Sequence, residues 1–172
     1  MQRNHNKMSL LTKQIYTMKK WFFLSALSVL AFVGCKKDDA STDCKQLAPT
    51  TIAPAAEKAY IENYLAANNI TTAVEKNGMY YVITTQGTGT SPNLCSNMSI
   101  DYVGKFMGAT TDGAQFDNSQ PGQPATLQLS NVISGWKLIL PLIKSGGSAT
   151  LYIPPSLAYG VDGRKVYLAM HI

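Results

Sequence analysis

Val132-Ile133-Ser134-Gly135-Trp136 opens an apolar segment that reaches Ile143, and this segment is the one stretch in the second half of the chain with helical periodicity. Its large apolar side chains recur at a spacing that places them on one helical face, at Trp136, Ile139, Leu140 and Ile143. Pro141 removes one backbone hydrogen bond and so limits the helix to a few turns, and Gly146-Gly147 ends it. The sequence therefore predicts one short helix in this half.

Strand-like runs lie on both sides of this helix. They are rich in β-branched and aromatic residues, and we expect strands at residues 79–85, 99–106, 115–117, 125–129, 149–153 and 165–172. Asn77-Gly78, residues 108–113 and Pro121-Gly122 mark turns. Several strands around one short helix predict an α+β domain.

A further helix is expected ahead of the strands, from about residue 55 to 68. Pro54 suits the first helical turn. The large side chains that follow it share one helical face, at Tyr60, Ile61, Tyr64 and Leu65. That face can pack on the domain or on a second copy of the chain, and the sequence leaves both possibilities open.

Three motifs follow one another along the chain: Asp101-Tyr102-Val103-Gly104, Phe116-Asp117-Asn118-Ser119 and the run at 132–136. In this order they resemble three motifs of the FKBP family of peptidyl-prolyl cis/trans isomerases. These are its strand with a Tyr-x-Gly core, its Phe-Asp-Ser motif and the Val-Ile-x-Gly-Trp entry to its single helix. Leu151-Tyr152-Ile153-Pro154 and Leu157-Ala158-Tyr159-Gly160 follow in family order, so the resemblance spans residues 79–172.

The resemblance implies an α+β fold in which an antiparallel half-open β-sheet wraps around one short helix, preceded by an N-terminal helix and a tether. It also implies isomerase activity in an aromatic pocket between sheet and helix. Carried over motif by motif, the catalytic residues are Tyr102, Phe116, Asp117, Ile133, Trp136 and Tyr159. The substrate-binding positions implied are Val132, Leu127 and Leu168.

Such a pocket needs neither a nucleophile nor a metal. Rotation about an X–Pro amide must break its resonance, against a barrier of ~20 kcal/mol. The planar amide is more polar than the twisted one, so a dry aromatic pocket favours the twisted state relative to the ground state. Trp136 would form the floor and Phe116 a wall, while the Ile133 N–H and the Tyr159 hydroxyl hold the flanking carbonyls. Asp117 either orients Tyr102 or faces the substrate carbonyl, and no cofactor is expected.

Taken singly, these residues have plainer interpretations. Trp136 and Phe116 suit an ordinary core, and Asp117 suits a turn. The joint pattern favours the pocket. The chain departs from the family after Tyr159-Gly160, where the long loop that forms one wall is shortened to residues 161–165. A pocket with one wall missing is wetter, so the alternative function is a weakly active or inactive FKBP-like binding module or chaperone.

The formal charge of +5 comes from the beginning of the chain. Five of the 15 Lys and Arg residues precede Cys35 with no acid among them, and the other ten are matched by the 10 acids that follow. The later part is therefore neutral, which excludes the basic face of a nucleic-acid-binding protein. No Cys/His cluster has metal-ligand spacing, so no metal site is expected.

Residues 1–34 have the pattern of a leader with a signal peptide. Met18-Lys19-Lys20 supplies a cationic start, with Met18 an alternative start of the chain, and the apolar run at 21–33 has the length of a signal core. A spanning helix would need roughly 20 apolar residues. Phe32-Val33-Gly34-Cys35 resembles a bacterial lipobox, which implies cleavage before Cys35 and lipidation of its thiol.

We therefore expect a lipidated tether over residues 35–54, a helical lead-in over 55–78 and an FKBP-like domain over 79–172. The implied location is the bacterial cell envelope, with the domain facing the periplasm or the cell surface. Cys44 and Cys95 can pair in that oxidising compartment or stay separate thiols. The expected activity is X–Pro isomerisation in envelope proteins, with proline-containing polypeptides as clients, a lipid contact to the membrane and, as one open possibility, a dimer through the N-terminal helix.

Overall fold

The computed structural model describes residues 46–160 and 166–171, with side chains described for 46–160. Several expectations lie outside this part of the chain: the leader 1–34, the lipidated Cys35, Cys44, the loop 161–165 and the side chain of Leu168. Cys95 is disulfide-bonded. Its pairing with Cys44 stays a prediction, because Cys44 is outside the described residues.

A two-residue hairpin at Asn77-Gly78 leads the chain into the sheet. It joins β1 (Val74–Lys76) to β2 (Met79–Thr85), and Lys76 pairs directly with Met79. Both turn residues have positive φ, 54° at Asn77 and 81° at Gly78, as a tight turn that matches the strand twist requires. The turn and β2 were predicted, whereas β1 was not, because its three residues carry no strand pattern of their own.

Seven strands form one sheet within the described residues, and every paired strand is antiparallel. The order is β1-β2-β6-β7-β3-β4, with β5 paired to β3. The remaining strands are β3 (Asn97–Met107), β4 (Asp112–Asn118), β5 (Ala125–Gln128), β6 (Ser148–Ile153) and β7 (Val166–His171). The antiparallel sheet around one short helix confirms the predicted α+β fold.

The long strand β3 serves two neighbours in succession. Its first part, Asn97 to Ile100, pairs with β5, and its next part, Asp101 to Phe106, pairs with β7. β4 begins three residues earlier than predicted, because pairing of Met107 with Asp112 extends the ladder into the expected turn. β5 ends one residue early, since the buried Leu129 starts a 3₁₀ turn, η1 (Leu129–Asn131).

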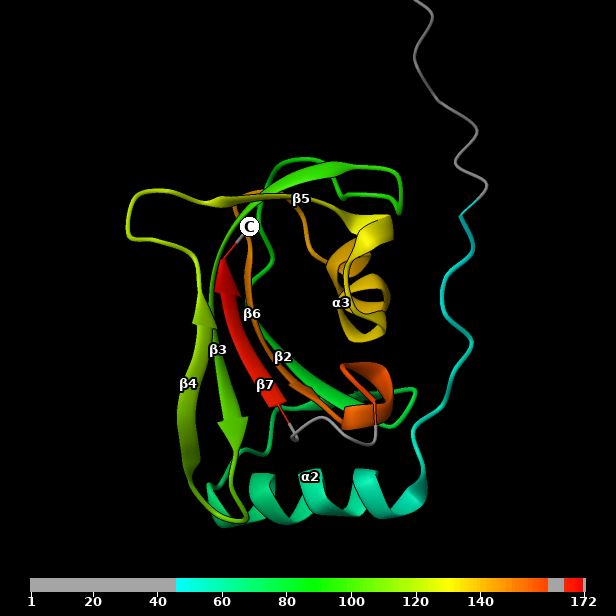
Figure 1. Cartoon of the computed structure of the whole chain (residues 1–172), viewed down its shortest axis with the longest axis vertical. Coiled ribbons are helices and arrows are strands. Elements are labelled where there is room, and N and C mark those ends of the chain that lie inside the picture. Colours follow the sequence, from blue (N-terminus) through cyan, green and yellow to red (C-terminus); the bar gives the residue numbers. More distant parts are fainter. Residues whose placement is uncertain (1–45, 161–165, 172) are drawn as a thin grey trace, which may run out of the picture. The chain divides into compact units, whose positions relative to one another are not determined.

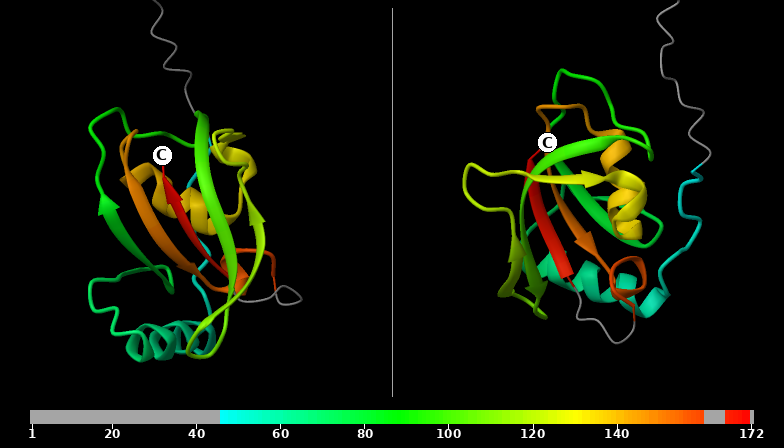
Figure 2. Two further views of the ribbon diagram at one scale, coloured as in Figure 1. Left: turned by 90° about the vertical axis from the view of Figure 1, so that its left-hand side faces the viewer. Right: turned by 45° about the horizontal axis from the view of Figure 1, so that its top comes forward.

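The two faces of the sheet pack against different helices. Alternate side chains of a strand point to opposite faces, and in β2 Met79, Tyr81 and Ile83 join the main core while Tyr80 and Val82 join a second cluster. The main core contains α3 (Ser134–Ile139), and the second cluster contains α2 (Ala55–Ala67). Figure 1 shows α3 beside the strands and α2 below them, and the two views of Figure 2 agree.

The predicted helix at 132–143 is shorter than expected. α3 starts at Ser134 and changes at Leu140 into a 3₁₀ turn, η2 (Leu140–Leu142), where Pro141 has no N–H to continue the helical ladder. The predicted apolar face is confirmed as buried, with Trp136 only 4% exposed. A Cβ at Gly135 would lie 2.7 Å from Cγ2 of the buried Ile153, so α3 approaches β6 more closely than any side chain would permit.

The helix expected at 55–68 is α2, and its apolar face packs on the sheet of its own chain. Ile61, Tyr64 and Leu65 are buried there beside Met107 and Tyr152. A dimer through this face stays a prediction, and it would need the face to leave the sheet. Ala53, near the end of the expected tether, is buried, and its N–H donates to the Asn77 carbonyl at 2.9 Å.

No helix in residues 46–160 and 166–171 combines the length and apolarity that a membrane crossing would need.

Because Gly135 lies so close to Ile153, we expect an alanine at position 135 to destabilise the fold, the opposite of its usual effect in a helix. In most helices Gly→Ala stabilises by roughly 0.5–1 kcal/mol. Here Gly135→Ala should lower the free energy of unfolding by about 1–3 kcal/mol, because the new methyl group overpacks the α3–β6 contact. Chemical denaturation measures it, with Ser134→Ala on the same helix as the near-neutral control. A Gly135→Ala chain as stable as the parent would show that α3 and β6 are not in tight contact.

Candidate functional site

A pocket of about 220 Å³ opens between α3 and the sheet. The side chains that line it come from β3, β4, β5, the end of η1, the entry to α3, α3 itself and the segment after η3 (Pro155–Leu157). They are Tyr102, Phe116, Asp117, Leu127, Asn131, Val132, Ile133, Trp136 and Tyr159. Every residue expected at the site lines this pocket, except Leu168, whose side chain lies outside the described part.

Trp136 forms the buried floor of the pocket. Its indole meets the ring of Tyr102 edge-on, with centroids 5.4 Å apart at 80°. Such edge-to-face pairs are favoured by the ring quadrupoles. The indole Nε1–H is buried and donates to no acceptor within the described residues, so the part of Trp136 that is open to the pocket consists of ring carbons.

Phe116 of β4 forms a wall that other rings support. Its centroid lies 4.8 Å from that of Phe106 and 6.3 Å from that of Tyr159, the second pair at 89°. Phe106 does not line the pocket, and the sequence did not single it out. It packs on the main core, and β3 pairs with β4, so its ring lies beside that of Phe116.

A hydrogen bond joins Tyr102 to Asp117. The Tyr102 hydroxyl donates to Oδ2 at 2.6 Å, and the backbone N–H of Asn118 donates to Oδ1 at 2.9 Å. Burial, the hydrogen bond to Asp117 and the charge of that carboxylate raise the pKa of Tyr102 to about 12. Tyr102 therefore stays a neutral donor throughout the physiological range of pH, and both carboxylate oxygens already accept hydrogen bonds.

Besides the buried indole N–H of Trp136, two hydrogen-bond donors at the pocket have no acceptor within residues 46–160. The Ile133 N–H precedes the first turn of α3 and has no acceptor within residues 46–160. The Tyr159 hydroxyl likewise bonds to none of the described residues, and its side chain is 59% exposed. Burial and then the charge of Asp117 raise the pKa of Tyr159, so this hydroxyl also stays protonated. The site can thus hold two carbonyl oxygens above an apolar floor.

Asn131 is the lining residue that sequence reasoning missed. It ends η1, directly before the Val-Ile-Ser-Gly-Trp run, and its amide donates to the Gln128 side chain at 3.1 Å. Its position next to that motif was the one available signal. Among the described residues, no group of three or more His, Cys, Asp or Glu side chains is placed to hold a metal ion.

Residues 89–169 match the family model described as FKBP-type peptidyl-prolyl cis-trans isomerase. The chain is 38% identical over 103 residues to peptidyl-prolyl cis-trans isomerase Mip of Coxiella burnetii, covering 58% of this chain and 43% of that one. It is 37% identical over 107 residues to the probable FKBP-type isomerase FkpA of Neisseria meningitidis, covering 62% and 37%. The chain thus spans less than half the length of these relatives.

Solved structures agree in fold. The isomerase of Pseudomonas syringae superposes with a TM-score of 0.54 at 31% identity, covering 70% of this chain and 92% of that one. FkpA of Escherichia coli superposes with the same TM-score at 27% identity, covering 67% and 60%. The matched family model and this near-complete coverage of a solved relative show that the chain belongs to the FKBP-type peptidyl-prolyl cis-trans isomerase family.

Proposed function

We propose that this chain is a peptidyl-prolyl cis/trans isomerase that acts on X–Pro bonds of polypeptides. The observation that carries the proposal is a ring-lined pocket with two donors at its edge, the Ile133 N–H and the Tyr159 hydroxyl, that have no acceptor within residues 46–160. An apolar floor suits a proline ring, and the two donors suit the carbonyl groups on either side of it. The names of the relatives support the same activity.

The pocket would lower the barrier by changing the surroundings of the amide. In water the planar amide is stabilised by hydration of its polar carbonyl, and rotation takes tens to hundreds of seconds. Trp136 and Phe116 would exclude that water from the proline side of the bond. Loss of hydration then raises the free energy of the planar amide more than that of the twisted amide, which has lost its resonance dipole. The barrier to rotation is lower as a result. No proton transfer or covalent intermediate is required.

The Ile133 N–H and the Tyr159 hydroxyl would fix the chain on both sides of the rotating bond. A rotation needs one side held while the other turns, so these two donors supply orientation. Asp117 would act through Tyr102, because its Oδ2 accepts a hydrogen bond from the Tyr102 hydroxyl at 2.6 Å and the Asn118 N–H holds its Oδ1 at 2.9 Å. Of the two roles considered for Asp117, this geometry supports the orienting one.

A binding module without fast turnover was the alternative drawn from the shortened loop. The shortened loop that suggests this alternative is at residues 161–165, outside the described part of the chain. No contact within the described residues favours the alternative. The same assay separates the two functions. A chain that binds proline peptides and suppresses aggregation of an unfolded client, yet leaves a proline-limited reaction unaccelerated, would be the binding module.

The isomerase proposal predicts that the chain speeds a refolding reaction limited by proline isomerisation, in proportion to its concentration. Phe116→Ala should lower this catalysed rate by roughly tenfold, because it removes a wall ring and admits water. Leu47→Ala is the matched control, since it removes an apolar side chain that is 88% exposed, and it should leave the rate unchanged. No acceleration by the unaltered chain would end the proposal.

A second prediction concerns the Ile133 N–H. Ile133 has φ −60° and ψ 154°, and Val132 before it is extended at φ −99° and ψ 175°. Both conformations accept a proline at position 133. Ile133→Pro therefore deletes the donor and keeps the backbone, and peptide affinity should fall by roughly tenfold, the value of one hydrogen bond of about 1.4 kcal/mol.

Ile133→Ala is the control for that variant, because it shortens the side chain and keeps the N–H. Fluorescence anisotropy of a labelled proline peptide measures both affinities. Equal affinities for the proline and alanine variants would show that the N–H does not contact the peptide.

We further propose that the chain works at the bacterial envelope, held there by lipid on Cys35, and helps envelope proteins to fold. The signal-like run and the lipobox resemblance support this location. One relative, 34% identical over 106 residues, is named outer membrane protein MIP, from Legionella longbeachae. Slow proline steps limit folding in any compartment, so an isomerase there has substrates.

The anchor is tested by replacing the cysteine. Cys35→Ser should move the chain from the membrane fraction of bacterial cells to the soluble fraction, because the acyl chains supply the membrane affinity. Immunoblotting of separated fractions measures it, with Cys44→Ser as the control. A Cys35→Ser chain that has the size expected after removal of the leader and still stays with the membranes would exclude lipid on this thiol as the anchor.

A further inference from the structure

One helix outside the pocket contacts both segments that carry its walls. α2 touches the segment before Tyr159 through its first turn and the β3–β4 turn through its last turns. The expected boundary between a helical lead-in and the FKBP-like domain falls after α2. The contacts of α2 nevertheless connect it to the walls of the pocket.

Glu57 in the first turn of α2 holds the N-terminal end of η3. Its Oε2 accepts from the Ser156 backbone N–H at 3.0 Å and from the Ser156 hydroxyl at 2.8 Å. Hydrogen bonds to a charged acceptor are stronger than those between neutral groups. One carboxylate oxygen thus fixes both the backbone and the side chain of a residue 99 positions away.

The segment that Glu57 holds leads directly to Tyr159. Pro155 and Leu157 are buried, and the Pro155 carbonyl accepts from the N–H groups of Ala158 at 3.0 Å and Gly160 at 2.7 Å. Tyr159 therefore sits inside a turn that closes on the Pro155 carbonyl, next to Ser156. Its side chain is 59% exposed, so few other contacts restrain it. The position of this wall depends on this turn.

The other end of α2 holds the turn between β3 and β4. The Tyr64 hydroxyl donates to Oδ1 of Asp112, and the Asn68 amide donates to the Thr110 carbonyl at 2.9 Å. β4 carries Phe116 and Asp117. Both walls, Tyr159 and Phe116, are thus connected to α2 by polar contacts.

We propose that Glu57 is a positioning residue for the pocket, which holds the Tyr159 wall in place through Ser156. This inference rests on the proposed function, since it concerns how the same pocket binds a peptide. A wall that is ordered beforehand does not have to be ordered by the ligand, and preorganisation of this kind raises affinity. Loss of the carboxylate leaves Tyr159 chemically intact and lets its turn move.

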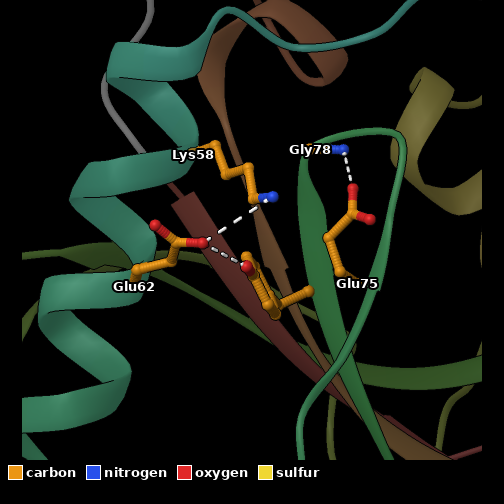
Figure 3. A network of polar contacts seen from close by, with 5 residues as sticks. Lys58, Glu62, Glu75 and Gly78 are labelled. Carbon is orange, nitrogen blue, oxygen red and sulfur yellow. Dashed lines mark hydrogen bonds and ion pairs between the residues drawn. The ribbon is translucent and has the colours of Figure 1, made fainter.

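Glu62 on the same helix provides the matched control. Figure 3 shows Glu62 directed toward Lys58, and the two form an ion pair at 3.7 Å. Glu62 also accepts from the Tyr80 hydroxyl at 2.6 Å, on the face of the sheet away from the main core. Glu62 is therefore, like Glu57, a carboxylate on α2. Its partners lie outside the two segments that carry Tyr159 and Phe116.

The experiment compares four full-length chains: the unaltered one, Glu57→Ala, Glu57→Gln and Glu62→Ala. Hydrogen exchange read by mass spectrometry reports the order of residues 155–160 without any ligand. Anisotropy of a fluorescein-labelled proline peptide reports affinity. In Glu57→Ala we expect exchange at 155–160 to quicken about tenfold and the peptide Kd to rise about fivefold, because the hydrogen bonds to a charged acceptor are lost.

Glu57→Gln keeps an acceptor oxygen but not its charge, so it should restore part of both losses, and Glu62→Ala should change neither. Unchanged exchange in Glu57→Ala would overturn the inference, and so would quicker exchange with unchanged affinity. Equal weakening in Glu62→Ala would also overturn it, since the effect would then be one of general stability. An unaltered chain that binds no peptide would instead defeat the proposed function, and it is recognised by the binding data alone.

Discussion

The close contact between α3 and β6 is the constraint on which the pocket depends. A side chain at Gly135 would come within 2.7 Å of the buried Ile153, so the helix can lie where it does only because residue 135 has none. Trp136, the next residue, is thereby held as the floor with Tyr102 against its edge. Because protein interiors are packed as densely as organic crystals, a small outward shift of α3 would loosen the floor and its neighbouring ring together.

The two faces of the sheet have different roles: one helps to form the pocket, and the other packs against α2. On one face, α3 and the apolar side chains of β2 and β6 form the main core beneath the rings. On the other, α2 packs through Ile61, Tyr64 and Leu65 and sends polar side chains to the segments that carry Tyr159 and Phe116. The helix expected as a lead-in thus contacts both segments that carry the walls of the pocket.

Most of the pocket followed from motif resemblance, and its supports did not. Trp136, Phe116 and Tyr159 lie in motifs whose order along the chain resembles the family, and they line one pocket. Phe106, Asn131 and the Glu57–Ser156 contact escaped prediction. Each depends on which residue of one strand, turn or helix lies opposite another, and such register is set by the folded sheet rather than by a local pattern.

The sequence by itself determined the local structure: the tight turn at Asn77-Gly78, the strand at β2 and the short helix that Pro141 interrupts. Backbone sterics and side-chain periodicity act over a few residues, so they are legible without the fold. Only the tertiary structure decided that the apolar face of α2 packs on its own sheet, and that Glu57 meets Ser156 across 99 residues. Which distant residues meet depends on the register and packing of the whole fold, and no local pattern carries that information.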